Sequence, residues 1–421
     1  MRATHKPFSP AAPAAGSLLL LFAALVCALP LAASAAEKPK VRAVTAFVRI
    51  ERAHYQEQVQ EALVMLRKAK AAYEEAGYEV QSIRIATQPF PEYTRGLSTQ
   101  EAVAFFREYD ALAQKEDFAP AIGPALLGGE DDPRQVELLR EILLHTNLNA
   151  SLTVAGEDGV RWKAVRAAAE LIKHWSEHSP GGIANFNFAA TAMVPPYTPF
   201  FPGAYHTGDG KKFAVALQSA NVVGEALASS RDPMKARDAL AAALGAHAKA
   251  IEAVAQRVAK DTGWEYMGID LSPAPLKEVS IGGAVEGFTG GKFGSSGTMT
   301  AATLITGVLR ELPVKRAGYS GLMVPVLEDS VLAERWSEGT LTLDALLAYS
   351  AVCGTGIDTV PLPGDVSVEQ LERIIGDMAS LAFKLRKPLS ARLMPVKGKK
   401  AGDRTDFNDP FLVNAVLQPL P

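Results

Sequence analysis

Hydrophobic and polar residues alternate along this chain with two periods, one typical of strands and one typical of helices. Residues 41–50 form a mostly apolar run that predicts a strand. Residues 54–77 then place Val59, Leu63 and Leu66 on one helical face, and Gly77 ends this pattern before a second predicted strand at 78–85. Later helical patterns lie near 99–115, 133–145, 160–178, 233–261, 297–311, 341–351 and 367–386. Later strand patterns lie near 118–123, 149–154, 184–192, 213–219, 264–271, 319–326, 355–361 and 389–395.

These patterns amount to about ten strands that alternate with helices, which favours a largely parallel sheet. Such a number of strands fits either a closed α/β barrel or a wide open sheet, and it exceeds the eight of a TIM barrel. The Pro-rich stretch 194–203 is too aromatic to be a linker and predicts an ordered, packed loop. We therefore expect a single α/β domain over residues 36–421, with its strands and helices between 41 and 410.

The first residues have the order of a secretory signal peptide. Basic residues lie near the start, an apolar run covers 18–29, and the small-residue pattern Ala33-Ser34-Ala35 follows. The apolar run is shorter than the roughly 20 residues that a membrane span needs. We expect residues 1–35 to be removed and the mature protein to be periplasmic or secreted, without a membrane anchor. The alternative is an uncleaved N-terminal anchor.

Composition narrows the classes of partner. The chain has 43 Lys and Arg against 46 Asp and Glu, a formal charge of -3, so it lacks the basic excess of a nucleic-acid-binding protein. It has two Cys residues, and removal of the signal peptide would leave only Cys353, which excludes an intrachain disulfide. We expect a small-molecule ligand and no nucleic acid, and we leave open assembly with further copies of the chain.

A Gly-rich segment at 281–298 precedes a predicted helix. Glycine permits close backbone approach, and the free N–H groups at a helix start attract anions. The P-loop pattern is absent, because Phe293 follows Lys292 where that motif has Ser or Thr. We expect a flexible active-site loop, with a structural turn as the alternative. Its candidate ligand-binding residues are Gly290, Gly291, Ser295 and Ser296.

Three acidic residues lie at or near predicted strand ends. Asp270 ends a strand before a Pro-rich turn, Glu328 follows the strand at 319–326, and Asp358 follows Gly-Thr-Gly-Ile. In α/β folds, strand ends carry ligand groups, and grouped carboxylates suit a divalent cation such as Mg²⁺. We therefore take the three acids as candidate catalytic residues and metal ligands that share a pocket, with the 282–297 segment at its rim. The alternative is that they cap helices.

Four further side chains are candidates for chemistry. His206, in a loop beside aromatic residues, has the side chain for general acid–base catalysis near neutral pH, although a surface position is the alternative. Cys353 is a candidate nucleophile, with a buried inert thiol as the commoner outcome. Arg392 and Lys397 flank a cationic loop at the end of the last predicted strand, which suits a carboxylate or phosphate.

Taken together, several segments resemble one known family in order along the chain. They are residues 42–45, 203–208, 268–272, 297–302, 319–329, 353–358 and 395–403. This series is similar to the bacterial and archaeal domain-of-unknown-function 711 family, also filed as uncharacterised protein family 0210, over roughly residues 41–410. The resemblance implies the ten-stranded α/β barrel of the pyruvate formate-lyase-like superfamily, and it places Cys353 on the loop that carries the thiyl radical in true radical enzymes. Their C-terminal Arg-Val-x-Gly-aromatic signature is absent, since Gly402 lies in Lys-Ala-Gly-Asp, so no glycyl radical is expected.

The sequence leaves two functional classes open. The first is an exported enzyme that acts on a small polar or anionic metabolite inside the barrel, by acid–base or metal-assisted chemistry. The second is a non-catalytic protein that binds an anionic small molecule, since no complete catalytic motif is present. A strongly shifted acid or a bound metal in the pocket would favour the enzyme.

Overall fold

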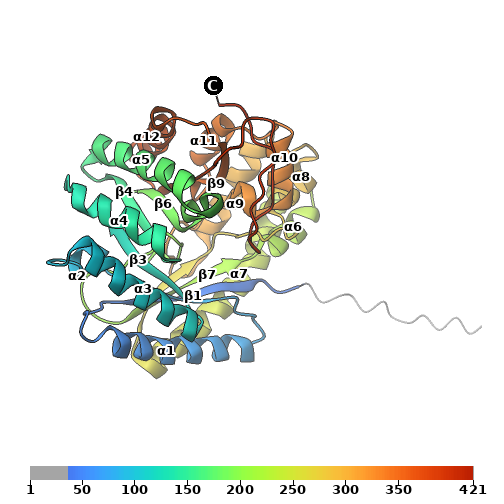
Figure 1. Cartoon of the computed structure of the whole chain (residues 1–421). Coiled ribbons are helices and arrows are strands. Elements are labelled where there is room, and N and C mark those ends of the chain that lie inside the picture. The colour runs from blue at the N-terminus through green and yellow to red at the C-terminus, as the bar shows by residue number, and fades with distance from the viewer. Residues whose placement is uncertain (1–36, 421) are drawn as a thin grey trace, which may run out of the picture. The chain divides into compact units, whose positions relative to one another are not determined.

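The computed structural model describes residues 37–420 (Figure 1). The predicted signal peptide and its cleavage site lie outside the described residues. None of the helices within 37–420 combines the length and the hydropathy needed to cross a membrane.

A mixed ten-stranded sheet forms the centre of the fold, in the order β8-β7-β1-β2-β3-β4-β6-β10-β9, with the short β5 paired to β4. The strands are β1 (Lys40–Val48), β2 (Ile83–Thr87), β3 (Ala119–Ala125), β4 (Asn149–Gly156), β5 (Gly159–Val160), β6 (Phe188–Ala192), β7 (Lys212–Gln218), β8 (Glu265–Asp270), β9 (Gly356–Pro363) and β10 (Leu389–Val396). The strands β1, β2, β3, β4 and β6 run parallel. The pairs β7–β8 and β9–β10 run in the opposite direction, because β7 joins β1 and β10 joins β6 antiparallel.

The strand ladder ends at β8 and β9, so the structure shows a mixed α/β sheet and leaves the predicted barrel unconfirmed. The strand predicted at 319–326 does not form. This segment makes a turn at Tyr319, ends in the short 3₁₀ helix η2 (Val326–Glu328), and touches the edge of the sheet through a single bridge between Pro325 and Asp358. A second single bridge joins Ile269 of β8 to Arg316 just before it.

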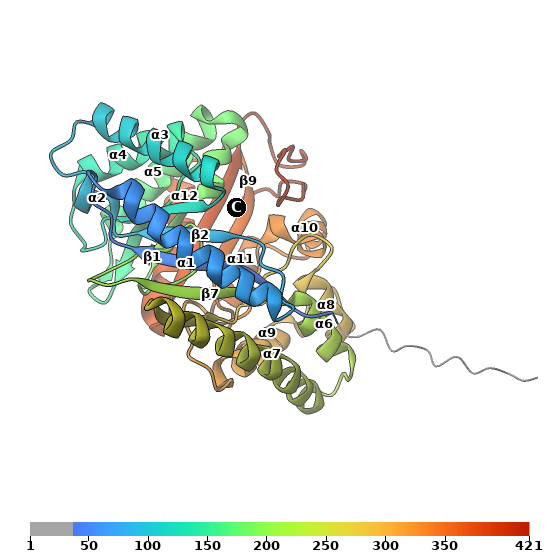
Figure 2. The same ribbon diagram turned by 90° about the horizontal axis from the view of Figure 1, so that it is seen from below.

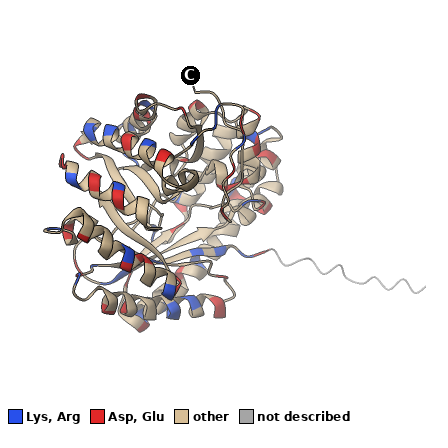
Figure 3. Cartoon of the chain, viewed as in Figure 1, with Lys and Arg blue, Asp and Glu red and all other residues tan. Residues whose placement is uncertain are grey.

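Helices cover the sheet. They are α1 (Tyr55–Glu75), α2 (Phe90–Tyr93), α3 (Thr99–Glu116), α4 (Pro133–His145), α5 (Trp162–His178), η1 (Pro180–Asn187), α6 (Ala220–Ala228), α7 (Pro233–Thr262), α8 (Ile281–Thr289), α9 (Thr298–Glu311), α10 (Ser330–Ser337), α11 (Leu343–Ser350) and α12 (Val368–Leu385). α3, α4 and α5 pack on the strands β3 and β4, and α1 lies beside α7 (Figure 2). Charged residues of both signs are interspersed on the helices, whereas the strands are mostly uncharged (Figure 3).

Local sequence signals explain where several helices begin and end. Ser98 and Glu101 form a reciprocal capping box at the start of α3, and Ser367 and Gln370 do so for α12. At the other end of a helix, Gly263 takes a left-handed conformation that stops α7.

The Gly-rich segment is not the flexible loop that we expected, because residues 281–289 form α8. Asp329 accepts hydrogen bonds from the N–H groups of Ile281 and Gly282, which stabilises the start of this helix. A Cβ atom on Gly282 would lie 3.0 Å from Leu332 of α10, so glycine allows close packing of the two helices. Gly282 therefore serves helix packing, and Gly290 ends α8 in a left-handed conformation.

The aromatic loop at 194–203 is packed, as predicted. Phe200 and Phe201 are buried. Phe201 joins Phe47, Ala86 and Ala214 in a cluster on the inner face of β1, β2 and β7. The loop therefore fills the space on this face of the sheet and forms one wall of the cavity described next.

Candidate functional site

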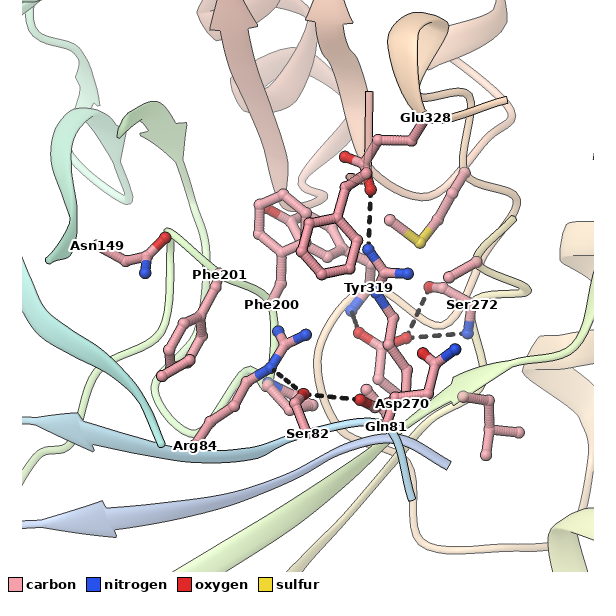
Figure 4. Close-up of a pocket in the computed structure, with 18 of the residues that line it drawn as sticks. Gln81, Ser82, Arg84, Asn149, Phe200, Phe201, Asp270, Ser272, Tyr319 and Glu328 are labelled. Carbon is pink, nitrogen blue, oxygen red and sulfur yellow. Dashed lines mark hydrogen bonds and ion pairs between the residues drawn. The ribbon is translucent and has the colours of Figure 1, made fainter. Parts of the chain in front are cut away.

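A cavity of about 280 Å³ lies where the two groups of strands meet (Figure 4). The first group is β1 to β4 with β6, and the second contains β7 and β8, which run in the opposite direction. The N-terminal ends of β1 to β4 therefore lie at the same edge of the sheet as the C-terminal ends of β7 and β8. The first group contributes Arg42, Arg84 and Asn149, and β8 contributes Asp270. We call this space the arginine cavity. Its remaining lining residues are Gln81, Ser82, Ala119, Phe186, Asn187, Pro199, Phe200, Phe201, Ala216, Leu217, Ser272, Ala274, Tyr319, Met323, Glu328, Arg392 and Phe411.

Four residues of alternating charge form a chain along one side of the arginine cavity; Arg42, Glu328 and Arg392 line the cavity, and Asp358 lies behind Arg392. Glu328 accepts a hydrogen bond from Arg42 Nη2 at 2.8 Å and one from Arg392 Nη2 at 2.5 Å. The Nε of Arg392 also donates to Asp358 Oδ1 at 2.7 Å. The guanidinium of Arg392 lies over the rings of Phe186 and Phe200, with 4.9 and 5.7 Å to their centroids. Strands β1, β9 and β10 and the helix η2 are thus joined by charge-assisted hydrogen bonds.

The two acids of this chain respond differently to burial. Burial alone would raise the pKa of Glu328, but the guanidiniums of Arg392 and Arg42 outweigh it and hold that pKa below its usual range. For Asp358, burial outweighs the attraction of Arg392, so its pKa is raised. The Oδ2 atom of Asp358 is buried and has no hydrogen-bond partner among residues 37–420.

Arg84 is the cation of the cavity that lacks an acidic partner. Its Nε donates to Ser82 Oγ at 3.0 Å, and its guanidinium lies over the ring of Phe201, 5.0 Å from the centroid (Figure 4). Within the described part of the chain, no carboxylate lies within salt-bridge distance of it. Burial and the nearby guanidiniums of Arg42 and Arg392 lower the pKa of Arg84 to about 9, although the carboxylate of Glu328, which lies beyond salt-bridge distance, acts in the opposite direction. The side chain is therefore still charged at neutral pH.

Asp270 holds a turn in place. Its Oδ1 accepts hydrogen bonds from the N–H and Oγ–H of Ser272 at 3.0 and 2.6 Å and from Ser320 N–H at 3.0 Å. Its Oδ2 accepts one from Tyr319 N–H at 3.0 Å. Burial raises the pKa of Asp270, and these donors act in the opposite direction. Gly318 precedes this turn with a φ of 63°, and a Cβ on it would lie 2.2 Å from Asp270 Oδ2.

The three predicted acids do not form the expected metal site. Asp270 and Glu328 line the arginine cavity, whereas Asp358 lies behind Arg392. Among residues 37–420, no three Asp, Glu, His or Cys side chains come together in a way that would hold a metal ion. The reason is that Arg392 supplies the positive charge between Glu328 and Asp358. Helix capping applies instead to Asp329, which caps α10 and also stabilises α8.

The Gly-rich segment and its predicted ligand-binding residues are not at the rim of the arginine cavity. Gly290, Gly291, Ser295 and Ser296 are absent from its lining. The hydroxyl group of Ser295 donates to the carbonyl of Lys292 at 2.5 Å. Lys397 is also elsewhere, where its Nζ donates to the carbonyl of Glu177 at 2.9 Å. Of the predicted ligand-binding residues, the structure brings only Arg392 to the cavity.

His206 and Cys353 lie outside the cavity lining as well. His206 is fully buried near the C-terminal end of β2, where its N–H donates to the Thr87 carbonyl at 2.9 Å. Neither ring nitrogen has a hydrogen-bond partner within the described residues. Burial, with help from Lys212 and Arg49, lowers the pKa of His206 to about 4.

Cys353 is a buried free thiol just after α11. Its carbonyl accepts a hydrogen bond from Lys387 Nζ, which also binds the carbonyl of Ser350 at the helix end. The adjoining Gly354 packs directly against Gly321, so this segment is closely packed. No contact of Cys353 with the arginine cavity supports a nucleophilic role, which remains a prediction.

The residues that the sequence did not single out are Arg42 and Arg84. Both interrupt apolar strand patterns, in Val41-Arg42-Ala43-Val44 and in Ile83-Arg84-Ile85. Strands of a covered parallel sheet are normally apolar on both faces, so a charged residue inside one is a signal of a polar site. That signal is available from the sequence, but it does not identify the partner of either side chain.

Comparisons with known proteins place most of this chain in one family. The family model described as "Uncharacterised ACR (DUF711)" matches residues 34–408. A "UPF0210 protein" of Pyrobaculum arsenaticum is 32% identical over 79% of this chain and 77% of its own length. Relatives of the same description from Methanopyrus kandleri and Syntrophobacter fumaroxidans are each 30% identical, over 87% and 79% of this chain and 88% and 77% of their own lengths. The chain therefore belongs to the DUF711 family, whose archaeal and bacterial members are named UPF0210 proteins.

Proposed function

We propose that this protein binds a small anionic molecule in the arginine cavity and holds its anionic group with Arg84. The observation that carries this proposal is that Arg84 lines the cavity without a carboxylate partner among residues 37–420. Arg42 and Arg392 line the same cavity, but both are paired with Glu328. Arg84 is thus the lining cation whose charge no carboxylate of the described residues meets at ion-pair distance.

A charged group in a largely desolvated place is costly unless an opposite charge or hydrogen-bond acceptors meet it. A guanidinium matches a carboxylate or phosphate through two parallel hydrogen bonds, which a ligand in the cavity can supply to Arg84. The volume of about 280 Å³ corresponds to roughly nine water molecules. The ligand is therefore expected to be a small metabolite.

The test is a thermal-shift titration of the purified protein with benzoate, acetate and inorganic phosphate. The wild-type protein should be stabilised by at least one of these anions in a concentration-dependent way. The Arg84→Gln variant should lose this response. Arg107→Gln is the matched control, because Arg107 is an exposed arginine on α3. An equal response of wild type and Arg84→Gln would contradict the proposal.

An enzyme that acts on this ligand is the second candidate. The observation that favours it is a pair of buried oxygens without a hydrogen-bond partner in the described residues, Tyr319 Oη and Asp358 Oδ2. Tyr319 lines the cavity, and burial raises the pKa of its hydroxyl group, which therefore keeps its proton at neutral pH. Burial also raises the pKa of Asp358, which lies behind the cavity wall against Arg392. A protonated hydroxyl group in the lining suits proton donation to a bound substrate, without a glycyl radical.

The enzyme is tested by turnover of whichever ligand the titration identifies. Tyr319→Phe should abolish turnover and leave the ligand affinity within about twofold of wild type if the hydroxyl group is a catalytic proton donor. Unchanged turnover in Tyr319→Phe would argue against this role and in favour of a binding protein.

The finer fold and the location of the protein are also proposals. The two single bridges, Ile269 to Arg316 and Pro325 to Asp358, support closure of the sheet into a barrel through residues 316–325.

The proposal of export rests on the signal-like pattern at residues 1–35. N-terminal sequencing of the protein from its native host should find a start near Ala36, and a chain that retains Met1 would contradict export with cleavage.

A further inference from the structure

We infer that the arginine cavity selects a monocarboxylate with an apolar, flat body and rejects molecules that carry an ammonium group or a second negative charge. This inference rests on the proposed function, because it assumes that a ligand binds there. It follows from the charges and hydrogen bonds already used within the cavity wall.

A ligand's ammonium group would need negatively charged acceptors in the cavity wall. Both oxygens of Glu328 already accept hydrogen bonds, one from Arg42 and one from Arg392. The two oxygens of Asp270 together accept four hydrogen bonds. These are the two acids of the cavity lining. An amino acid would therefore place its ammonium group beside two carboxylates whose charge is already met, by two guanidiniums at Glu328 and by four donors at Asp270, so little attraction would offset its desolvation.

The charges of the cavity wall limit how many negative charges a ligand can carry. Arg42, Glu328, Arg392 and Asp358 form a chain in which opposite charges alternate. Arg84 stands outside this chain and adds one further positive charge to the cavity wall. Asp270, the other acid of the lining, is held by four donors of its own turn and makes no ion pair with Arg84, so a ligand carboxylate is the partner left for Arg84. A phosphate dianion would bring a second charge, although the other two arginines of the lining are already paired with Glu328.

The aromatic and apolar side chains of the cavity suit the non-charged part of such a ligand. The ring of Phe201 packs against the guanidinium of Arg84. Phe200, Leu217 and Met323 supply apolar surface in the same cavity. Phe200 and Tyr319 pack edge to face, with ring centroids 5.1 Å apart. A ring attached to a carboxylate fits both this surface and the cavity volume.

The experiment is a calorimetric comparison of three matched probes on the purified protein. They are phenylacetate, its amino counterpart phenylglycine, and phenyl phosphate. Phenylacetate should bind, and each of the other two should bind at least about tenfold more weakly. Arg84→Gln should weaken phenylacetate binding by about tenfold or more, whereas Arg107→Gln should not change it.

The outcomes separate the inference from the proposed function. If phenylglycine or phenyl phosphate binds as tightly as phenylacetate and Arg84→Gln abolishes this binding, the cavity binds anions and the selectivity inferred here is wrong. If none of the probes binds at concentrations up to about 10 mM, the proposed function itself fails for this cavity. Circular dichroism spectra of Arg84→Gln and Arg84→Lys should match that of wild type, so that lost binding is not lost folding.

Discussion

Replacement of Arg84 by Met should stabilise the unliganded protein. Arg84 is a partly buried cation without a carboxylate partner in the described residues, and burial with two neighbouring guanidiniums lowers its pKa to about 9. Methionine has a similar length and removes the charge, while its apolar side chain still packs on Phe201. A buried charge that no partner compensates is one of the few cases in which removal of a polar group raises stability.

The size of the stabilisation expected for Arg84→Met follows from the pKa shift of Arg84. The pKa of Arg84 falls from 12.5 to about 9, and each unit corresponds to about 1.4 kcal/mol, so the charge costs at most about 5 kcal/mol. Water in the cavity offsets part of this cost. The variant also loses the hydrogen bond to Ser82 and the cation–π contact with Phe201, each worth about 1 kcal/mol. We expect a net gain of about 1–3 kcal/mol, measured as a higher midpoint of urea unfolding.

Arg392→Met is the matched comparison, because it removes an arginine from the same cavity with the opposite consequence. It leaves Asp358 without a cation and Glu328 with Arg42 alone, and we expect a loss of about 3–5 kcal/mol. The reasoning is refuted if Arg84→Met lowers the free energy of unfolding by more than about 1 kcal/mol. Such a loss would mean that the guanidinium of Arg84 stabilises the fold and is not an uncompensated charge available to a ligand.

Three further predictions follow from buried groups. The pKa of His206 is about 4 in the folded protein and its ordinary value is 6.5, so the unfolded chain protonates first as the pH falls. The free energy of unfolding should therefore drop by about 2–3 kcal/mol between pH 6.5 and 4, and His206→Gln should remove this part of the pH dependence of urea unfolding. Gly318→Ala should lower the free energy of unfolding by about 2–4 kcal/mol, because the φ of Gly318 is 63° and a Cβ would lie 2.2 Å from Asp270 Oδ2. The control is Gly307→Ala, which lies in open space on α9 and should be neutral or slightly stabilising in urea unfolding. Asp270→Asn should lower the melting temperature and cost about 2–3 kcal/mol, since an amide group cannot accept all four hydrogen bonds; a loss below about 1 kcal/mol would show that these bonds contribute little.

Much of the fold could be predicted because its signals are local. The strand at 41–50 and the helix at 54–77 were predicted by periodicity alone and correspond to β1 and α1. The helix α8 could not be predicted in this way, because its glycines are unfavourable for a helix. Its stability depends on Asp329 and on packing against α10, which are far away in the sequence.

The site was less predictable, because its chemistry depends on pairing across the sheet. Asp270, Glu328 and Arg392 were predicted from strand-end positions, and the structure places all three in the lining of one cavity, although Glu328 belongs to η2 and Arg392 lies within β10. Their roles as catalytic or binding residues remain predictions. The sequence could not show that Arg392 would lie between Glu328 and Asp358, which turns a predicted metal site into a chain of ion pairs. Arg84 was missed because only the fold reveals that no carboxylate accompanies it.

The most direct test of the central claim is a crystal structure of the protein grown with phenylacetate. Our account predicts the carboxylate of the ligand at about 3 Å from the two terminal nitrogens of Arg84, with the ring against Phe200 or Leu217 in the arginine cavity. A side chain of the protein paired with Arg84, or phenylacetate bound elsewhere while the cavity holds only water, would contradict it.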